Sequence, residues 1–190
     1  KNYLGRNKLL SFTKDNDNNN LIIKTSDGEF YSDYLLLTSG TFESNKKLHI
    51  AGEDNNPRIK YGLNYTERYI NKNILIVGGG NSAIETALAL FKDNKVTLIV
   101  RKNNFHEKVT EKNLIEIKNA EKENGVKIMF ESEIQEFNDN DAKVKNKQNE
   151  YVNLPYDITY IHIGFEQPTK FLKSNGINMH EMEFSSRPIL

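Results

Sequence analysis

One short stretch constrains this chain more than any other: residues 73–82 read NILIVGGGNS, where aliphatic residues lead directly into three glycines. The residues that follow, Ser82 to Phe91, carry apolar side chains at helical spacing. A short aliphatic run of this kind is typical of a strand buried on both faces of a parallel sheet. The sequence therefore predicts a strand, a tight glycine turn and a helix in direct succession.

Gly78, Gly80 and Ala83 have the spacing G-x-G-x-x-A at the junction of this strand and helix. In dinucleotide-binding folds the first glycine allows the tight turn, the second lets a diphosphate approach the main chain, and the small third residue lets the helix pack closely on the strand. The N–H groups of the first helical turn, from Asn81 and Ser82 onward, then face the anion. The same pattern also occurs as a turn without a ligand, but the strand before it and the helix after it favour the dinucleotide.

The residues after this motif continue to alternate between strand and helix. Strands are expected at residues 96–100, 126–130 and 157–163, and a second helix at Glu111–Glu123 with Thr110 as its N-cap. The pieces EIQEF and AKVKN, which lie between residues 133 and 154, interrupt the alternation and predict a small antiparallel meander. The expected fold class is therefore α/β, a Rossmann-like three-layer domain with a parallel sheet and an antiparallel β meander.

The N-terminal part of the chain reads differently. Strands are expected at residues 9–13 and 21–25, followed by a hairpin turn at Asp27-Gly28 and the apolar run YLLLTSG at residues 34–40. The first residue is Lys, and the last segment stops in an apolar run, so we expect a piece of a longer protein. The predicted divisions are residues 1–50, a connector at 51–72, the dinucleotide-binding domain at 73–166 and a return segment at 167–190.

The end of the second strand of the motif indicates which dinucleotide is bound. NAD-binding proteins usually place a carboxylate about 20 residues after the glycines, on the ribose hydroxyl, whereas NADP-binding proteins place basic residues there. Here Arg101 and Lys102 occupy this place, which favours NADPH; alternatively the two form a solvated strand end. His106 could add to the phosphate pocket. Glu85 either stabilises the helix dipole or contacts the nicotinamide end.

Composition excludes several classes of function. The chain has no cysteine, which removes disulfides, thiolate metal sites and a dithiol redox centre, and no His and carboxylate cluster at ligand spacing indicates a metal. The 26 basic and 26 acidic residues balance, which argues against a nucleic-acid-binding protein. No apolar stretch is long enough for a membrane span, and no signal peptide is evident, so a cytoplasmic protein is expected.

Three segments carry a family resemblance: GGGNSAIE, the pair RK after TLIV, and YIHIGFEQPTKFL. They resemble the NADPH domain of thioredoxin reductase-like flavoproteins, a branch of the FAD/NAD(P)-dependent pyridine nucleotide oxidoreductases. The family's second motif is His-Arg-Arg-x-x-x-Arg. Here Arg101 and Lys102 match its two adjacent basic positions, whereas Val100 stands in place of the first His and His106 in place of the last Arg. The resemblance implies that Arg101, Lys102 and His106 hold the 2′-phosphate and that Gly164 lets the adenosine side approach. It assigns no catalytic side chain to this chain.

The resemblance extends upstream and implies that residues 1–50 are part of the family's FAD domain, namely its hairpin and its last strand, which would lie in the run 34–40. Thr38, Ser39 and Gly40 then replace the Ala-Thr-Gly element that ends this domain. The FAD-binding glycine motif and the C-terminal Gly-Asp element are absent, so this chain alone is expected to be inactive. The implied function is to bind NADPH and pass hydride to FAD, then to ferredoxin, flavodoxin or a small disulfide. A homodimer is implied for the full-length protein. The alternative is a free-standing NADP-binding regulatory module without an electron acceptor.

Overall fold

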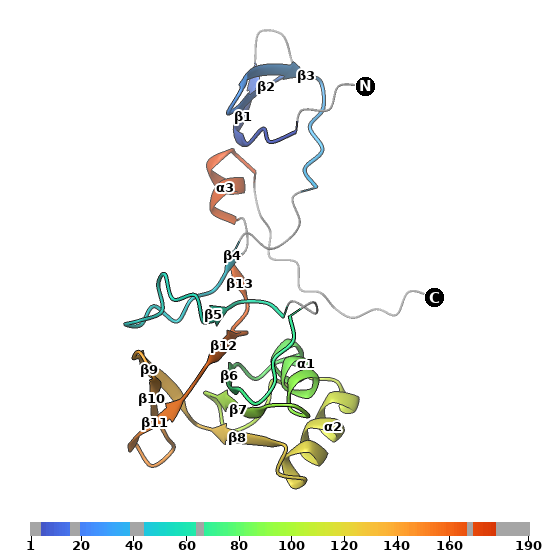
Figure 1. Ribbon diagram of the computed structural model, residues 1–190. Helices are drawn as coiled ribbons and strands as arrows, with labels where there is room; N and C mark the ends of the chain where they lie inside the picture. The colour runs from blue at the N-terminus through green and yellow to red at the C-terminus, as the bar shows by residue number, and fades with distance from the viewer. Residues whose placement is uncertain (1–4, 16–19, 39–43, 64–66, 167–168, 178–190) are drawn as a thin grey trace. The chain divides into compact units, whose positions relative to one another are not determined.

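The computed structural model describes residues 5–15, 20–38, 44–63, 67–166 and 169–177 (Figure 1). The chain divides into two compact units: Lys1–Ser44 together with Glu166–Leu190, and Asn45–Phe165. The short strands β4 (Ser44–Asn45) and β13 (Phe165–Glu166) form a two-stranded sheet, and the division of the chain falls within both of them. Among the described residues, no helix combines the length and apolarity that crossing a membrane requires.

The unit Asn45–Phe165 is built on a five-stranded parallel sheet. Its hydrophobic strands are buried on both faces, as parallel strands covered by other layers must be. Every pairing between neighbours is parallel. In spatial order the strands are β5 (Ile59–Lys60), β12 (Ile158–Ile161), β6 (Asn73–Val77), β7 (Lys95–Val100) and β8 (Val126–Phe130).

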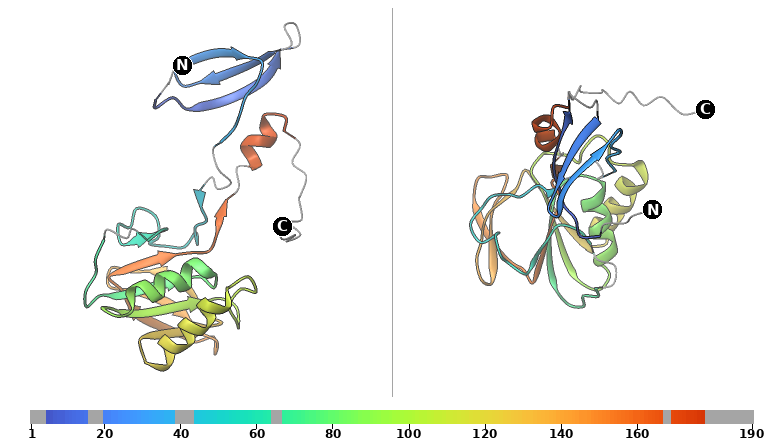
Figure 2. Two further views of the ribbon diagram at one scale, coloured as in Figure 1. Left: turned by 90° about the vertical axis from the view of Figure 1, so that its right-hand side faces the viewer. Right: turned by 90° about the horizontal axis from the view of Figure 1, so that it is seen from above.

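Two layers cover this sheet, one on each face (Figure 2). The alternating side chains of β6 show the arrangement, since Ile74 and Ile76 pack toward the helices whereas Leu75 and Val77 pack toward the meander. The expected three-layer α/β fold is therefore confirmed. The helices are α1 (Asn81–Leu90) and α2 (Glu111–Lys122), and the meander consists of β9 (Glu133–Phe137), β10 (Asp141–Lys145) and β11 (Tyr151–Pro155).

The meander contains a strand that the sequence patterns did not predict. β11 pairs antiparallel with β10, and Asn146 closes the hairpin between them. The Oδ1 atom of Asn146 accepts hydrogen bonds from the backbone N–H groups of Gln148 and Glu150, both at 2.9 Å. Asn149 takes a left-handed conformation with φ 63°, which Asn tolerates better than most residues.

The other unit contains the antiparallel sheet of β1 (Leu9–Asp15), β2 (Asn20–Thr25) and β3 (Gly28–Ser32). The hairpin predicted at Asp27-Gly28 is confirmed, since Thr25 pairs with Gly28 across the turn. The helix α3 (Thr169–Ser174) belongs to the same unit.

Residues 34–38 correct an expectation, because they form no strand although the apolar run 34–40 suggested one. A strand requires a neighbouring strand with which it pairs, and among the described residues this segment pairs with none. Tyr34 and Leu36 are 88% and 86% exposed.

Candidate functional site

The winding of the parallel sheet changes direction at β6. From β6 the chain passes through α1 to β7 and through α2 to β8, moving to the same side each time. β12 and β5 lie on the other side of β6. In open α/β sheets, ligands bind outside the carboxyl ends of the strands at such a point. We call residues 78–83, after β6, and residues 162–164, after β12, the switch-point edge.

Gly78 occupies the tightest position of this edge. Its φ is 143°, and a β-carbon added there would lie 2.3 Å from the carbonyl oxygen of His162. The same β-carbon would lie 3.3 Å from the β-carbon of Ala83, which is fully buried. The roles predicted for the first glycine and for the small third residue thus have a visible steric basis. No side chain fits at Gly78 without moving the backbone after β12.

Gly80 differs from Gly78 in having open space around it. A β-carbon added at Gly80 would meet no atom within 4 Å. Gly80 is the N-cap of α1, no side chain caps this helix, and its first turn contains no acidic residue. The first N–H groups of a helix have no partner inside the helix, so this terminus offers free donors and the positive end of the helix dipole. These are the features that an anion site requires.

The N-terminus of α2 provides a contrast within the same unit. The hydroxyl of Thr110, the predicted N-cap, accepts a hydrogen bond from the backbone N–H of Asn113, and Glu111 lies in the first turn. A side chain therefore satisfies one of the free donors of α2, and a carboxylate lies near its dipole. Only α1 of these two helices begins uncapped.

The side chains of Asn81 and Glu85 have protein partners. The Oδ1 atom of Asn81 accepts hydrogen bonds from Thr110 N at 3.0 Å and Asn113 Nδ2 at 2.9 Å, and its Nδ2 atom donates to Lys108 O at 3.0 Å. Glu85 Oε1 accepts from Asn113 Nδ2 at 3.0 Å. Asn81 thus contributes its backbone N–H to the helix terminus, while both side chains tie α1 to α2. Ser82 is exposed in the same first turn.

The basic residues follow β7, the neighbour of β6. Arg101 and Lys102 are exposed, and Arg101 Nε lies 3.8 Å from Glu133 Oε1 in a loose ion pair. A pair this long and this exposed contributes little to stability, so the guanidinium is easily diverted to a phosphate.

His106 is brought to the glycine turn by the loop after β7. Its backbone N–H donates to the carbonyl oxygen of Gly79 at 2.8 Å, and its ring Nδ1 accepts from Lys108 N at 3.2 Å. Because Nδ1 acts as an acceptor here, the ring proton lies on Nε2. The tertiary structure thus places this loop against the switch-point edge.

On the β12 side, Gly164 has a positive φ of 99° and open space, since a β-carbon there would meet only Lys46 Cδ at 4.0 Å. Thr38, the described member of the predicted FAD element, is exposed, while Ser39 and Gly40 lie outside the described residues. Thr38 belongs to the unit that contains Lys1–Ser44, whereas the switch-point edge belongs to the other unit.

His162 links the end of β12 to the glycine turn and to α1. Its backbone N–H donates to Val77 O at 2.7 Å, and its ring Nε2 lies 3.0 Å from the hydroxyl of Thr86 in α1. The His162–Thr86 bond was not foreseen, although Thr86 is a polar residue on the buried face of a helix. This bond connects α1 to the end of β12.

Burial lowers the pKa of His162 below its ordinary value of 6.5. Between the folded and unfolded pKa values the unfolded chain binds more protons, so we expect the free energy of unfolding to fall as the pH drops below 6.5. Urea denaturation at a series of pH values would measure this loss, and His162→Gln should remove it. The pKa of Asp157 is also lowered, chiefly by the hydrogen bond from the backbone N–H of Asn73. The stability that this carboxylate contributes is lost only below its ordinary pKa of 3.8, so this loss begins at a lower pH than the loss caused by His162. If His162→Gln showed the same pH dependence of the free energy of unfolding as the unchanged protein, His162 would not be the cause of the loss.

The fold and the glycine turn define a Rossmann-like α/β protein of the FAD/NAD(P)-binding class. The family model described as pyridine nucleotide-disulphide oxidoreductase matches residues 7–188. The chain belongs to this family, which confirms the resemblance seen in its sequence.

Individual relatives show the same likeness. The chain is 30% identical over 179 residues to a ferredoxin–NADP reductase of Malacoplasma penetrans, covering 89% of this chain and 54% of the relative. It is 22% identical over 163 residues to the bacilliredoxin reductase Bdr of Bacillus subtilis, covering 85% and 50%. The chain thus spans about half the length of these relatives.

Solved structures support the fold. The bacillithiol disulfide reductase Bdr of Staphylococcus aureus superposes with a TM-score of 0.83 at 23% identity, covering 94% of this chain and 54% of that one. The thioredoxin reductase of T. acidophilum gives a TM-score of 0.74 at 23% identity, covering 92% and 58%. Because each of these structures is only 23% identical to this chain, the likeness shows a shared fold.

Proposed function

We propose that this chain is the NADPH-binding portion of a flavin-dependent oxidoreductase. The observation that carries the proposal is the uncapped N-terminus of α1 at the switch point, where Gly80 leaves open space and Gly78 permits the tight turn. A diphosphate there would accept hydrogen bonds from the N–H groups of Asn81, Ser82 and Ala83. Membership of the family and the names of the relatives support this reading.

The adenosine end of the cofactor would extend toward the end of β7. Arg101 and Lys102 would hold the 2′-phosphate, with the Nε2–H of His106 as an additional donor from the loop that lies on Gly79. The open backbone at Gly164 would border the same ligand from the β12 side. Glu85, whose Oε1 accepts a hydrogen bond from Asn113 Nδ2, would orient α1 and contact the nicotinamide end of the cofactor.

NADPH supplies a hydride, which FAD accepts in reductases of this kind. This chain's part is to bind and orient the reduced nucleotide, because hydride transfer depends on position more than on an acid or base. For FAD the described residues offer no comparable fit: Thr38 is exposed, and residues 34–38 form no strand. We therefore assign no flavin-binding step to the described residues.

The names of the relatives suggest two classes of electron acceptor, an electron carrier such as ferredoxin or flavodoxin and a low-molecular-weight disulfide. We propose that the complete protein serves one of these, in the cytoplasm and as a homodimer. A dithiol relay through this chain is excluded because it contains no cysteine. Comparing NADPH oxidation by the complete protein with each acceptor would distinguish the two classes. A complete protein that binds NADPH but reduces no acceptor would favour the regulatory module instead.

Titration of the chain with NADPH and NADH tests the binding site directly. Arg101→Ala is expected to weaken NADPH binding on the order of tenfold while changing NADH binding little, because only NADPH carries the 2′-phosphate. Lys95→Ala is the matched control, since Lys95 is an exposed cation at the amino end of the same strand. Equal weakening of both nucleotides by Arg101→Ala would show that the basic pair does not select the phosphate.

A further inference from the structure

Lys46 lies beside the carboxyl end of β12, in a place that no sequence motif marked. Its backbone N–H donates to Gly164 O at 3.0 Å. Its δ-carbon lies 4.0 Å from the position that a β-carbon on Gly164 would occupy, so the side chain runs along Gly164. Gly164 follows His162 by two residues, and the carbonyl of His162 contacts the glycine turn at Gly78. Lys46 is thus positioned on the β12 side of the switch-point edge, whereas α1 begins on the β6 side.

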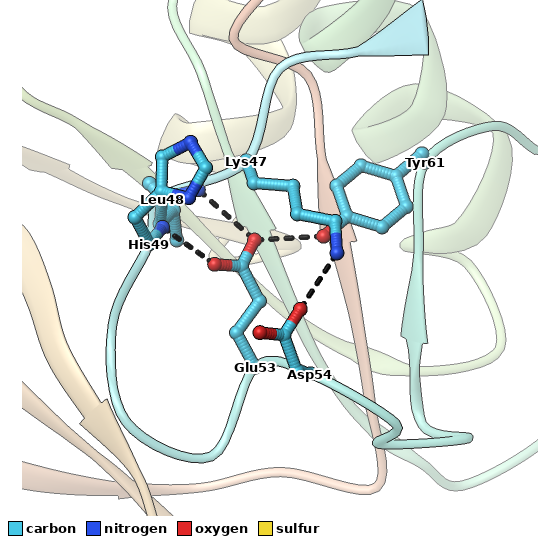
Figure 3. Close-up of polar contacts among 6 residues, drawn as sticks. All are labelled: Lys47, Leu48, His49, Glu53, Asp54 and Tyr61. Atoms are coloured by element: carbon cyan, nitrogen blue, oxygen red, sulfur yellow. Dashed lines mark hydrogen bonds and ion pairs between the residues drawn. The ribbon is translucent and has the colours of Figure 1, made fainter.

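The loop that carries Lys46 is held in place by a buried carboxylate (Figure 3). Glu53 is only 4% exposed, and it accepts hydrogen bonds from the backbone N–H groups of Leu48 at 2.9 Å and His49 at 2.6 Å. The hydroxyl of Tyr61 donates a third hydrogen bond at 2.7 Å. The bound carboxylate thus holds the backbone two and three residues after Lys46, and the hydrogen bond of Lys46 N to Gly164 O holds this lysine at the end of β12.

Lys46 and its neighbour Lys47 differ in their electrostatic partners. Lys47 Nζ lies 2.6 Å from Asp54 Oδ1, and its pKa is raised by that hydrogen bond. In the part of the chain that the structure describes, the ammonium of Lys46 has no carboxylate partner. Counting only described residues, a cation without a carboxylate partner therefore lies next to the edge where α1 offers free N–H groups.

We propose that Lys46 binds the diphosphate of the dinucleotide from the β12 side, opposite the N-terminus of α1. This inference rests on the proposed function. The helix terminus provides N–H donors and a partial positive charge, and a lysine from the other side would provide a full charge for the same anion. Such a contact would act on NADPH and NADH alike, because both nucleotides contain the diphosphate. It differs in this respect from the contacts of Arg101 and Lys102.

Measuring the dissociation constants of NADPH and NADH for Lys46→Met in the 190-residue chain tests the proposal. We expect both to weaken by about tenfold, the effect of one lost hydrogen bond to a charged group. Lys47→Met is the matched control, because it removes a neighbouring cation that is already paired, and it should change neither constant. Lys46→Arg should retain most of the affinity. Urea denaturation of each variant would establish that the fold is intact.

The possible outcomes distinguish a failure of the Lys46 proposal from a failure of the proposed function on which it rests. Unchanged binding of both nucleotides by Lys46→Met would overturn it while leaving the proposed function in place. Loss of NADPH binding alone would also overturn it, since that result would assign Lys46 to the 2′-phosphate. A wild-type chain that bound neither nucleotide would overturn the proposed function and this inference together.

Discussion

Gly78→Ala is expected to lower the free energy of unfolding of the unit Asn45–Phe165 by about 3 kcal/mol or more. Two physical effects act together. The φ of 143° is strained for any residue with a β-carbon, and that carbon would lie 2.3 Å from the carbonyl oxygen of His162, in a segment hydrogen-bonded to Val77. Amide hydrogen exchange followed in each unit separately would measure the loss.

Gly28→Ala provides the matched control for Gly78→Ala. Gly28 has nearly the same φ, 145°, but a β-carbon there would meet no atom within 4 Å. Its replacement should therefore cost only the backbone strain, about 1 to 2 kcal/mol, in the unit that contains the hairpin. If the two variants lost equal stability, the close approach of His162 to the glycine turn would be disproved.

Gly80→Asp is expected to affect stability and binding in opposite directions. Gly80 has φ −103° and ψ 179°, an extended conformation that aspartate adopts freely, and there is open space around it. An aspartate would cap the exposed N–H groups of α1 and raise the free energy of unfolding by about 0.5 to 1 kcal/mol. Its carboxylate would then occupy the site of the diphosphate. Binding of both NADPH and NADH should weaken on the order of 100-fold or more, because like charges would be brought together.

Gly80→Asn tests whether the negative charge of aspartate, or only the presence of a side chain in the anion site, weakens nucleotide binding. Asparagine is a good N-cap of nearly the same size, but it is neutral. It should weaken nucleotide binding less than aspartate does, with a smaller gain in stability of about a few tenths of a kcal/mol, because it lacks the charge that interacts with the helix dipole. Isothermal titration with each nucleotide, paired with urea denaturation, gives both quantities. Undiminished binding by Gly80→Asp would show that the N-terminus of α1 is not the anion site.

Local sequence patterns encode some elements of this fold and not others. The strand at Asn73–Val77 and the helix after it were predicted because aliphatic runs and helical spacing are local signals. The sequence did not predict the strand β11. It did predict a strand within the run 34–40, and residues 34–38 form none. Both depend on pairing, since a strand exists only where a neighbour accepts its hydrogen bonds, and the neighbour is chosen by the tertiary fold.

The residues of the candidate site likewise fall into two groups, those marked by a local sequence pattern and those placed only by tertiary contacts. The sequence by itself contained the glycine spacing and the basic pair Arg101 and Lys102, and it predicted a dinucleotide ligand, because a strand followed by a bare turn and a helix is a local pattern with a known geometry. Only the tertiary structure decided that His162 fills the space beneath Gly78 and that Lys46 lies at the end of β12. Those contacts join residues far apart in the chain. The first follows from the parallel pairing of β12 with β6, and the second lies next to the pairing of β4 with β13; no local pattern encodes either pairing.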